Sequence, residues 1–345
     1  MICPDENALA DYLAGNASLA DIDEVTVHME ACVACRELIT ELARTAPART
    51  LPPDLPPDEP MHVDALYAGV ALDGRFVLKR WLGAGGMGVV WAASDANGND
   101  VALKVLRIAD PEHRQRLLRE ARIARALVHA SVVRVREVLE TRQLSGPVLV
   151  MDLVRGEPLE ERLSRAPRLT LRETAALLEP VVRGVTVAHA QGIVHRDLKP
   201  RNILVDWSAS PDPRAYVLDF GVAKILFAGD GESARITRSG TVIGTPQYMA
   251  PEQLFGEKEL DHRADVWSLG TILYRCLAGV PTIAASSFGE VFKAITVGRI
   301  TPLREVAPSL PESVLSLVDS MLVRDRAHRL DDLAIAGDVL ARFAT

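Results

Sequence analysis

A glycine-rich stretch between two apolar segments sets the strongest limit on how the front of this chain can fold. The stretch is LGAGGMGVV, with Gly83, Gly85 and Gly88 in the order G-x-G-x-x-G. A dinucleotide-binding fold opens a helix directly after such glycines, whereas here the β-branched, apolar run VVWAAS follows. The pattern therefore predicts a loop that joins two strands, and the backbone N–H groups of such a loop can bind phosphate oxygens.

The neighbouring segments predict the fold class. RFVLKRWLG and VVWAASD flank the glycine loop, and DVALKVL follows a turn at Asn97 and Gly98, so three strands are expected. Residues 111–130 are strongly periodic, with Pro111 near the start, and predict a long helix. Beyond PVLVMDLV the pattern is mostly helical. A small strand-rich N-terminal part and a larger helical C-terminal part of this domain predict an α+β fold with two lobes.

Lys104, in VALK, lies sixteen residues after Gly88. A lysine in an apolar strand is usually an edge residue whose ammonium group reaches solvent. Beside a phosphate-binding loop it can instead supply positive charge to a nucleotide. Glu120, in the middle of the predicted helix, could pair with it; the plain alternative is a solvated carboxylate.

The stretch HRDLKPRN concentrates His195, Arg196, Asp197, Lys199 and Asn202, and the aspartate of LDFG lies seventeen residues after Asn202. The domain that carries it resembles the eukaryotic-type protein kinases of bacteria, in their Ser/Thr branch. The resemblance rests on LGAGGMGVV, VALK, HRDLKPRN, DFG, GTPQYMAPE and DVWSLG, in the family's order and spacing. It implies a two-lobed kinase fold over residues 71–345, with an N-lobe at about 71–151 and a C-lobe at about 155–345.

The resemblance also implies ATP and Mg²⁺ as cofactors and assigns roles. Asp197 would accept the proton of the substrate hydroxyl and Lys199 would lie by the transferred phosphoryl group. Asn202 and Asp219 supply hard oxygen ligands for Mg²⁺, and Lys104 would hold the nucleotide phosphates with Glu120 as its partner. The residues expected to bind ATP are Leu82, Gly83, Ala84, Gly85, Gly86, Met87, Gly88, Val90, Ala102, Lys104, Met151, Asp152 and Val154.

Further roles follow from the same resemblance. Glu252 of APE is expected to form a buried ion pair with Arg329, and Asp265 of DVWSLG to support the catalytic loop. His195 is expected to pack rather than to act as a base. Arg196 would bind a phosphate on the segment between Asp219 and Glu252, where the expected phosphosites are Thr237, Ser239 and Thr241.

The front of the chain carries a separate cluster, in HMEACVACRE. His28, Cys32 and Cys35 have the spacing i, i+4, i+7, which predicts one helix face, and Cys3 could complete four zinc ligands. The alternatives are a C-x-x-C redox pair and ordinary packing. The pattern resembles the zinc-binding domain of anti-sigma factors, which implies a small helical module over residues 1–44. The Pro-rich stretch that follows predicts a linker over residues 45–70.

Composition and charge narrow the function class. The net charge of −7 gives no indication of nucleic-acid binding, and no apolar run approaches the ~18 residues of a membrane span. The start has no secretory signal pattern, so a cytoplasmic protein is expected. We expect an ATP- and Mg²⁺-dependent Ser/Thr protein kinase that acts on proteins, including itself. Its N-terminal module, with zinc bound or not, would dock a sigma-like or other regulatory partner. The alternative is a regulatory binding protein that sequesters such a partner, with kinase activity secondary.

Overall fold

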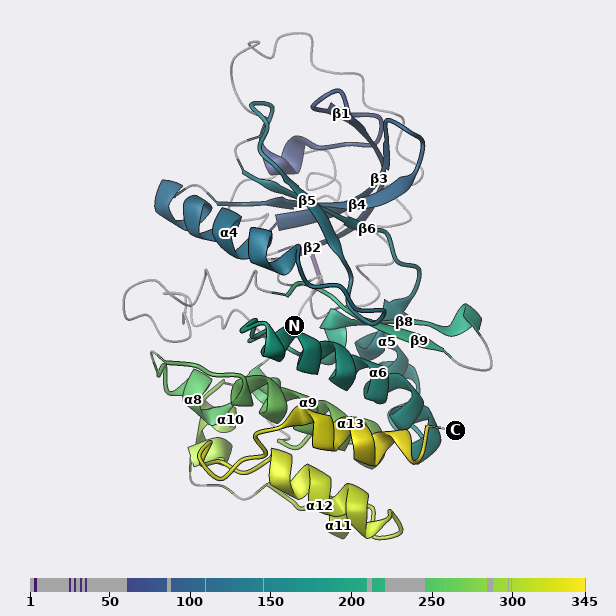
Figure 1. Ribbon diagram of the computed structural model, residues 1–345, viewed down its shortest axis with the longest axis vertical. Coiled ribbons are helices and arrows are strands. Elements are labelled where there is room, and N and C mark those ends of the chain that lie inside the picture. Colours follow the sequence, from purple (N-terminus) through teal and green to yellow (C-terminus); the bar gives the residue numbers. More distant parts are fainter. Residues whose placement is uncertain are drawn as a thin grey trace. The chain divides into compact units, whose positions relative to one another are not determined.

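The chain is described by a computed structural model, and it forms two compact units (Figure 1). The first unit comprises Met1–Arg114 with Glu137–Leu153, and the second comprises Gln115–Arg136 with Val154–Thr345. The structure describes residues 3, 4, 25, 28, 32, 35, 61–85, 88–108, 110–144, 146–209, 213–220, 246–257, 259–283, 288–296, 298 and 300–344.

A six-stranded sheet, in the order β1-β2-β3-β4-β6-β5, dominates the front of the chain. The strands are β1 (Ala71–Leu72), β2 (Phe76–Gly85), β3 (Gly88–Asp95), β4 (Asp100–Leu106), β5 (Val135–Leu139) and β6 (Val148–Asp152). The three predicted strands are therefore confirmed. The predicted turn between β3 and β4 is also present, because the Asp95 carboxylate accepts the backbone N–H groups of Asn97 and Asn99, and Gly98 has a φ of 82°.

The core of the first unit includes residues that the sequence assigns to the linker. Val63, in the short 3₁₀ helix η1 (Val63–Ala65), and Leu66 and Val70 are buried against the sheet strands. Met61 pairs with Leu144 in an isolated β-bridge. Residues 61–70 are apolar at regular intervals and contain no proline. This part of the predicted linker therefore belongs to the folded unit.

Helix α4 (Pro111–Ala124) begins where the sequence predicts but ends six residues earlier than expected. The backbone N–H groups of Ala126 and Leu127 bond to the carbonyls of Ile123 and Ala124, three residues back, which tightens and ends the helix. Leu127 is buried while Val128 is exposed. The prediction that the helix runs through Ala130 is wrong because apolar periodicity continued into a turn.

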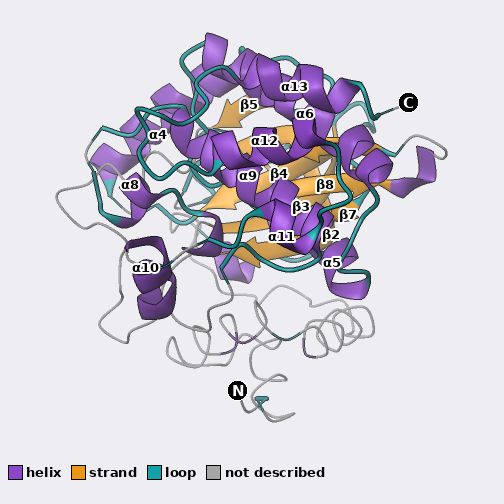
Figure 2. Cartoon of the chain, turned by 90° about the horizontal axis from the view of Figure 1, so that it is seen from below, coloured by secondary structure: helices purple, strands orange, loops and turns teal. Residues whose placement is uncertain are grey.

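The second unit is mainly helical (Figure 2). Its helices are α5 (Leu159–Arg165), α6 (Leu171–Ala190), α8 (Pro251–Leu254), α9 (Arg263–Ala278), α10 (Phe288–Thr296), α11 (Leu303–Val306), α12 (Glu312–Met321) and α13 (Leu333–Ala341). A three-stranded sheet, in the order β7-β8-β9, joins β7 (Glu157–Pro158), β8 (Ile203–Asp206) and β9 (Arg214–Val217). The 3₁₀ helices are η2 (Pro200–Asn202), η3 (Trp207–Ala209) and η4 (Pro246–Tyr248). The expected α+β class is confirmed.

Helices α6 and α9 form the centre of the second unit. Helix α6 begins at a capping box, in which the Thr170 hydroxyl accepts the Glu173 N–H and the Glu173 carboxylate accepts the Thr170 N–H. Helix α13 packs along α6 (Figure 1). Arg183 on α6 bonds to Asp338 on α13 at 2.8 Å. Helix α9 is buried on nearly all sides, and its Trp267 is fully buried. These two helices form a rigid base for the loop that precedes β8.

Candidate active site

The loop of residues 195–202 brings three of the predicted site residues together. The Asp197 carboxylate accepts hydrogen bonds from the Lys199 ammonium group at 3.0–3.1 Å and from the Asn202 side-chain amide at 3.1 Å. The Asn202 amide nitrogen also donates to the Asp197 backbone carbonyl at 2.7 Å. Because the amide nitrogen is directed at Asp197, the amide oxygen of Asn202 is the atom available to a cation.

Asp219 is positioned through its neighbour Leu218. The Leu218 N–H donates to the Asn202 backbone carbonyl at 2.9 Å, and the Leu218 carbonyl lies 2.7 Å from Nε2 of His195. Asp219 itself has a φ of 62°, a conformation uncommon for a residue other than glycine. The two backbone bonds at Leu218 thus fix the chain just before the strained Asp219 peptide.

His195 packs in this network, as predicted from the resemblance. It is fully buried, and its ring lies edge-on to Phe220 with the centroids 4.8 Å apart. Nδ1 of His195 accepts the Asp197 N–H at 3.3 Å, so Nε2 carries the proton and donates to the Leu218 carbonyl. The tautomer leaves no basic nitrogen for a reacting hydroxyl.

Asp265, at the start of α9, supports the loop from below. Its carboxylate accepts the backbone N–H groups of His195 and Arg196 and the Nε2 proton of His189, each at 2.8 Å. Burial alone would raise the pKa of Asp265, but the bonds from His189 and the His195 N–H hold that pKa below its usual value. The predicted support of the loop by Asp265 is confirmed, whereas the contribution of His189 was missed. No spacing rule links residues 76 positions apart.

The first unit carries most of the other predicted residues, whereas Glu120 and Val154 belong to the second unit. Gly85 faces Gly88 across the hairpin of β2 and β3, and Lys104 on β4 pairs with Val90 on β3. Ala102, also on β4, pairs with Met151 on β6, and both are buried. Gly88 has a φ of 149°, and a Cβ there would collide with the carbonyl oxygen of Val105, so this position requires glycine.

Several predicted residues lie outside the part of the chain that the structure describes. These are Gly86 and Met87, the side chain of Glu120 on α4, and the expected phosphosites Thr237, Ser239 and Thr241. The ion pair of Lys104 with Glu120 therefore stays a prediction.

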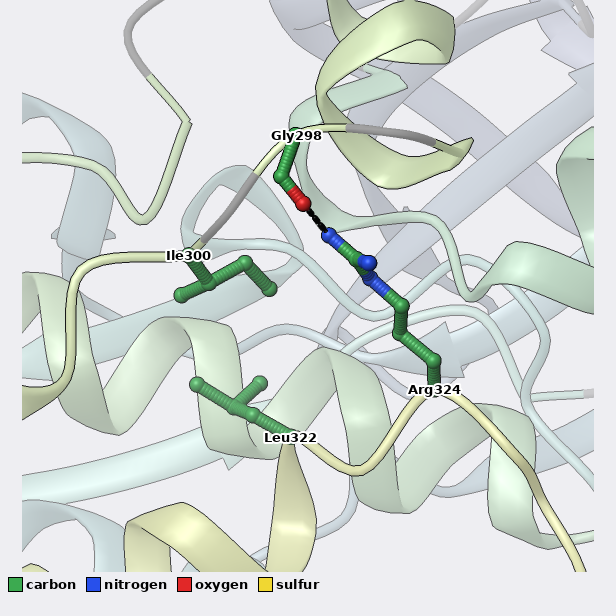
Figure 3. A pocket seen from close by; sticks show the side chains of 4 residues that line it. All are labelled: Gly298, Ile300, Leu322 and Arg324. Carbon is green, nitrogen blue, oxygen red and sulfur yellow. Dashed lines mark hydrogen bonds between the residues drawn. The ribbon is translucent and has the colours of Figure 1, made fainter.

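A surface pocket of about 330 Å³ lies elsewhere in the second unit and involves none of the predicted site residues (Figure 3). It is lined by Gly298, Ile300, Leu322 and Arg324. The Arg324 guanidinium donates to the carbonyls of Gly298 and Ala294, near the end of α10. We regard this arginine as a structural cap.

Cys3, His28, Cys32 and Cys35 converge in the first unit. Their ligand atoms all lie within 4.8 Å of one another, and the sulfur atoms of Cys3 and Cys32 are 4.0 Å apart. His28 is 4% exposed, and its Nε2 is buried without a hydrogen-bond partner among the described residues. A hydrogen bond from the Cys35 backbone lowers the pKa of Cys32 to about 7, whereas burial raises that of Cys35 to about 12.

The predicted helix is interrupted within this cluster. Val25, His28 and Cys35 are helical, but Cys32 is not, although its N–H still bonds to the His28 carbonyl at 2.8 Å. The expectation of one continuous helix through all three ligands is therefore wrong at Cys32. That bond keeps the i, i+4 connection between His28 and Cys32 although Cys32 itself is not helical.

Comparison with known proteins agrees with this geometry. Residues 76–338 match the protein kinase domain family. Serine/threonine-protein kinase PknA of Mycobacterium tuberculosis is 38% identical over 270 residues, which cover 76% of this chain and 59% of that protein. PknH of Mycobacterium bovis is 35% identical over 272 residues, covering 77% and 43%. Serine/threonine-protein kinase pkn2 of Myxococcus xanthus is 36% identical over 287 residues, covering 79% and 34%.

The chain belongs to the protein kinase family, with a strand-rich N-lobe and a helical C-lobe. The relatives compared are serine/threonine-protein kinases, and the chain spans at most 59% of their length. The alternative of a regulatory protein with secondary kinase activity finds no support in these matches. Within the described residues, no helix has the length and apolar character to cross a membrane.

Proposed function

We propose that this chain is an ATP- and Mg²⁺-dependent serine/threonine protein kinase that phosphorylates proteins, including itself. The observation that carries the proposal is the Asp197–Lys199–Asn202 constellation in a domain of the protein kinase family. Phosphoryl transfer depends on positioning and on neutralising charge more than on covalent chemistry by the protein. The Asp197 carboxylate meets the need for positioning, because the Lys199 ammonium group and the Asn202 amide hold it in one orientation.

Asp197 accepts or orients the proton of the attacking hydroxyl in this proposal. Lys199 shares the Asp197 carboxylate and carries the positive charge that offsets the charge of the transferred phosphoryl group. Asn202, through its amide oxygen, and Asp219 would hold Mg²⁺, which suits their hard oxygen donors. When bound, the cation neutralises the phosphate oxygens.

Residues of the first unit would supply most of the contacts to the nucleotide. Lys104 is 7% exposed on β4, so its ammonium group sits on a rigid strand that can orient it toward the α- and β-phosphates. The Gly85–Gly88 hairpin would cover the phosphates. Ala102 and Met151, paired on β4 and β6, are buried apolar residues suited to the adenine side. The backbones of Asp152 and Val154 would supply its polar contacts.

The experiment is phosphate transfer from labelled ATP to a generic Ser/Thr protein substrate and to the chain itself. Lys104→Met should lose most of both activities, because phosphate positioning is lost, while circular dichroism shows a retained fold. Wild-type protein that transfers no phosphate with Mg²⁺ present, or a fully active Lys104→Met variant, would contradict the proposal.

We also propose that Cys3, His28, Cys32 and Cys35 form a structural zinc site. Two thiolates bound tetrahedrally at about 2.3 Å from zinc lie ~3.8 Å apart, close to the 4.0 Å between Cys3 and Cys32. That separation far exceeds the ~2.05 Å of a disulfide. The buried Nε2 of His28 has no hydrogen-bond partner among the described residues, and a metal ion would satisfy this polar atom. Packing alone would not supply a partner for this buried nitrogen.

We propose that this zinc site would stabilise the anti-sigma-like module of residues 1–44. It contains too few residues to bury a large core, so a metal ion would supply much of its stability. Docking of a sigma-like or other regulatory protein on this module, and a cytoplasmic location, are proposals that rest on the sequence resemblance.

A further inference from the structure

Arg196, the residue before Asp197, has an unusual backbone conformation. Arg196 has a φ of 66°, a left-handed conformation that is strained for a residue with a side chain and persists only where the surroundings enforce it. The Arg196 N–H is fixed by the Asp265 carboxylate at 2.8 Å. That bond holds the backbone N–H of Arg196. The carbonyl of Arg196 belongs to the peptide that leads to Asp197.

The other side of Arg196 is held by Gln253, which the mechanism above does not use. Nε2 of Gln253 donates to the Arg196 carbonyl at 2.7 Å. The N–H of the same peptide, which belongs to Asp197, donates to Nδ1 of His195 at 3.3 Å. The plane that precedes Asp197 is therefore fixed at its oxygen by Gln253 and at its nitrogen by His195.

The Gln253 side chain has a fixed orientation of its own. Its Oε1 accepts the Ala250 N–H at 3.0 Å, at the start of helix α8. A reversed amide would face that N–H with an NH₂ group and the Arg196 carbonyl with an oxygen, which would lose both bonds. The neighbouring Glu252 is anchored to Arg329 by two hydrogen bonds at 2.7 and 2.9 Å, which keeps α8 in place.

We propose that Gln253 is a positioning residue for phosphotransfer: it fixes the Arg196–Asp197 peptide plane and with it the direction of the Asp197 carboxylate. The inference rests on the proposed kinase function. It also joins the end of the Asp219–Glu252 segment to the catalytic loop, because Gln253 directly follows that segment. Sequence reasoning missed Gln253 because Ala250 is not a capping residue, so no capping box could be read from the pattern.

Two variants separate the bridging role of Gln253 from its capping role. Gln253→Glu keeps an oxygen for the Ala250 N–H but has no donor for the Arg196 carbonyl. Gln253→Met loses both bonds and adds no charge, so it controls for the charge that Glu introduces. Glu257→Gln is the matched control just after α8, where the Glu257 carboxylate forms a surface ion pair with Arg326 at 3.3 Å.

The measurement is steady-state phosphotransfer together with thermal unfolding of each full-length variant. We expect both Gln253 variants to lose about tenfold in kcat, the equivalent of one lost hydrogen bond. The KM for ATP should stay within about twofold of wild type, and Gln253→Glu should keep the wild-type Tm. Glu257→Gln should match wild type in every respect.

The outcomes distinguish this inference from the proposed function. Inactive wild-type protein would refute the kinase proposal itself. Active wild type with both Gln253 variants within about twofold in kcat would overturn the positioning role alone. A loss of kcat that merely follows a loss of folded protein, as the Tm and the circular dichroism report it, would make Gln253 a structural residue and equally overturn the inference.

Discussion

Glu252 and Arg329, 77 positions apart, form a doubly hydrogen-bonded ion pair with both side chains almost completely buried. Arg329 also donates to the carbonyls of Val323, Arg324 and Arg263, and its guanidinium lies over the Trp267 ring at 5.2 Å. The pair therefore joins α8, the start of α9 and the loop before α13. A buried pair of this kind is sensitive to the removal of either partner.

Glu252→Ala should lower the free energy of unfolding by about 3–5 kcal/mol, because it leaves the Arg329 charge buried without its partner. Denaturant unfolding followed by tryptophan fluorescence measures this. The control is Asp319→Asn, which removes an exposed partner of Arg304 at 3.0 Å and should cost less than about 1 kcal/mol. If the two variants lower the free energy of unfolding equally, the buried pair stabilises the fold no more than an exposed pair does.

Asp197→Asn should abolish phosphotransfer while leaving the affinity for ATP within a few-fold of wild type. The carboxylate acts on the substrate hydroxyl, and the nucleotide is bound by other residues. Asp206→Asn is the control, because Asp206 bonds only to Ser208 among the described contacts and lies on β8. Turnover by Asp197→Asn near the wild-type rate, with ATP binding unchanged, would refute the assignment of Asp197.

Asp265→Asn should destabilise the protein by about 1–3 kcal/mol, because an amide cannot accept all three donors at this position. Since the pKa of Asp265 is lowered in the folded state, its ionised form stabilises the fold at every pH above the unfolded value of about 3.9. That contribution is lost as the pH falls through the lower folded pKa.

The stability difference between wild type and Asp265→Asn should thus be constant from about pH 5 to 8 and shrink below about pH 4. Urea unfolding over this pH range measures it. A difference that stayed constant down to pH 3 would show that the charge of Asp265 is not the stabilising factor.

The order of motifs along the chain predicted the fold class, because strand and helix periodicities and the glycine loop are local signals. Local signals also placed β4 at Asp100–Leu106. They failed at the end of α4, because the apolar spacing continues into the turn before Leu127. They also failed at residues 61–70, which were predicted as linker but pack against the sheet. In both cases tertiary burial decided the structure.

The site residues likewise divide into those that local signals predicted and those that they missed. Asp197, Lys199 and Asn202 lie within six residues of one another, so their convergence follows from one short loop. His189 bonds to Asp265 across 76 positions, and Gln253 bonds to Arg196 in the loop across 57. Side-chain hydrogen bonds over such separations leave no periodic pattern in one sequence. The Cys3 ligand was predicted only because cysteine is rare in this chain.

Phosphorylation of the segment between Asp219 and Glu252 should raise activity. Arg196 adjoins Asp197, and a phosphate on Thr237, Ser239 or Thr241 would give it a strong anionic partner. Phosphopeptide mapping of active protein should find at least one of these residues modified, and the triple alanine variant should have lower activity. If that variant is as active as wild type, the Arg196 mechanism does not operate here.

Metal analysis of the reduced full-length chain should find one equivalent of zinc. Cys35→Ser should lose it, since a structural site needs all four ligands. Cys276→Ser is the matched control, because Cys276 is buried in α9 of the second unit and lies outside the cluster. It should keep the zinc.

Removal of zinc by a strong chelator should expose the N-terminal module to proteolysis while the Tm of the kinase domain stays unchanged, because the Pro-rich segment separates the two. Thiolate ligands must release protons to bind the metal, so zinc retention should weaken as the pH is lowered from 7.5 to about 5. Zinc far below one equivalent in zinc-replete protein would refute the site. A mass loss of two hydrogens without reductant, with the disulfide mapped to Cys32 and Cys35 by peptide analysis, would then identify these two as a redox pair instead.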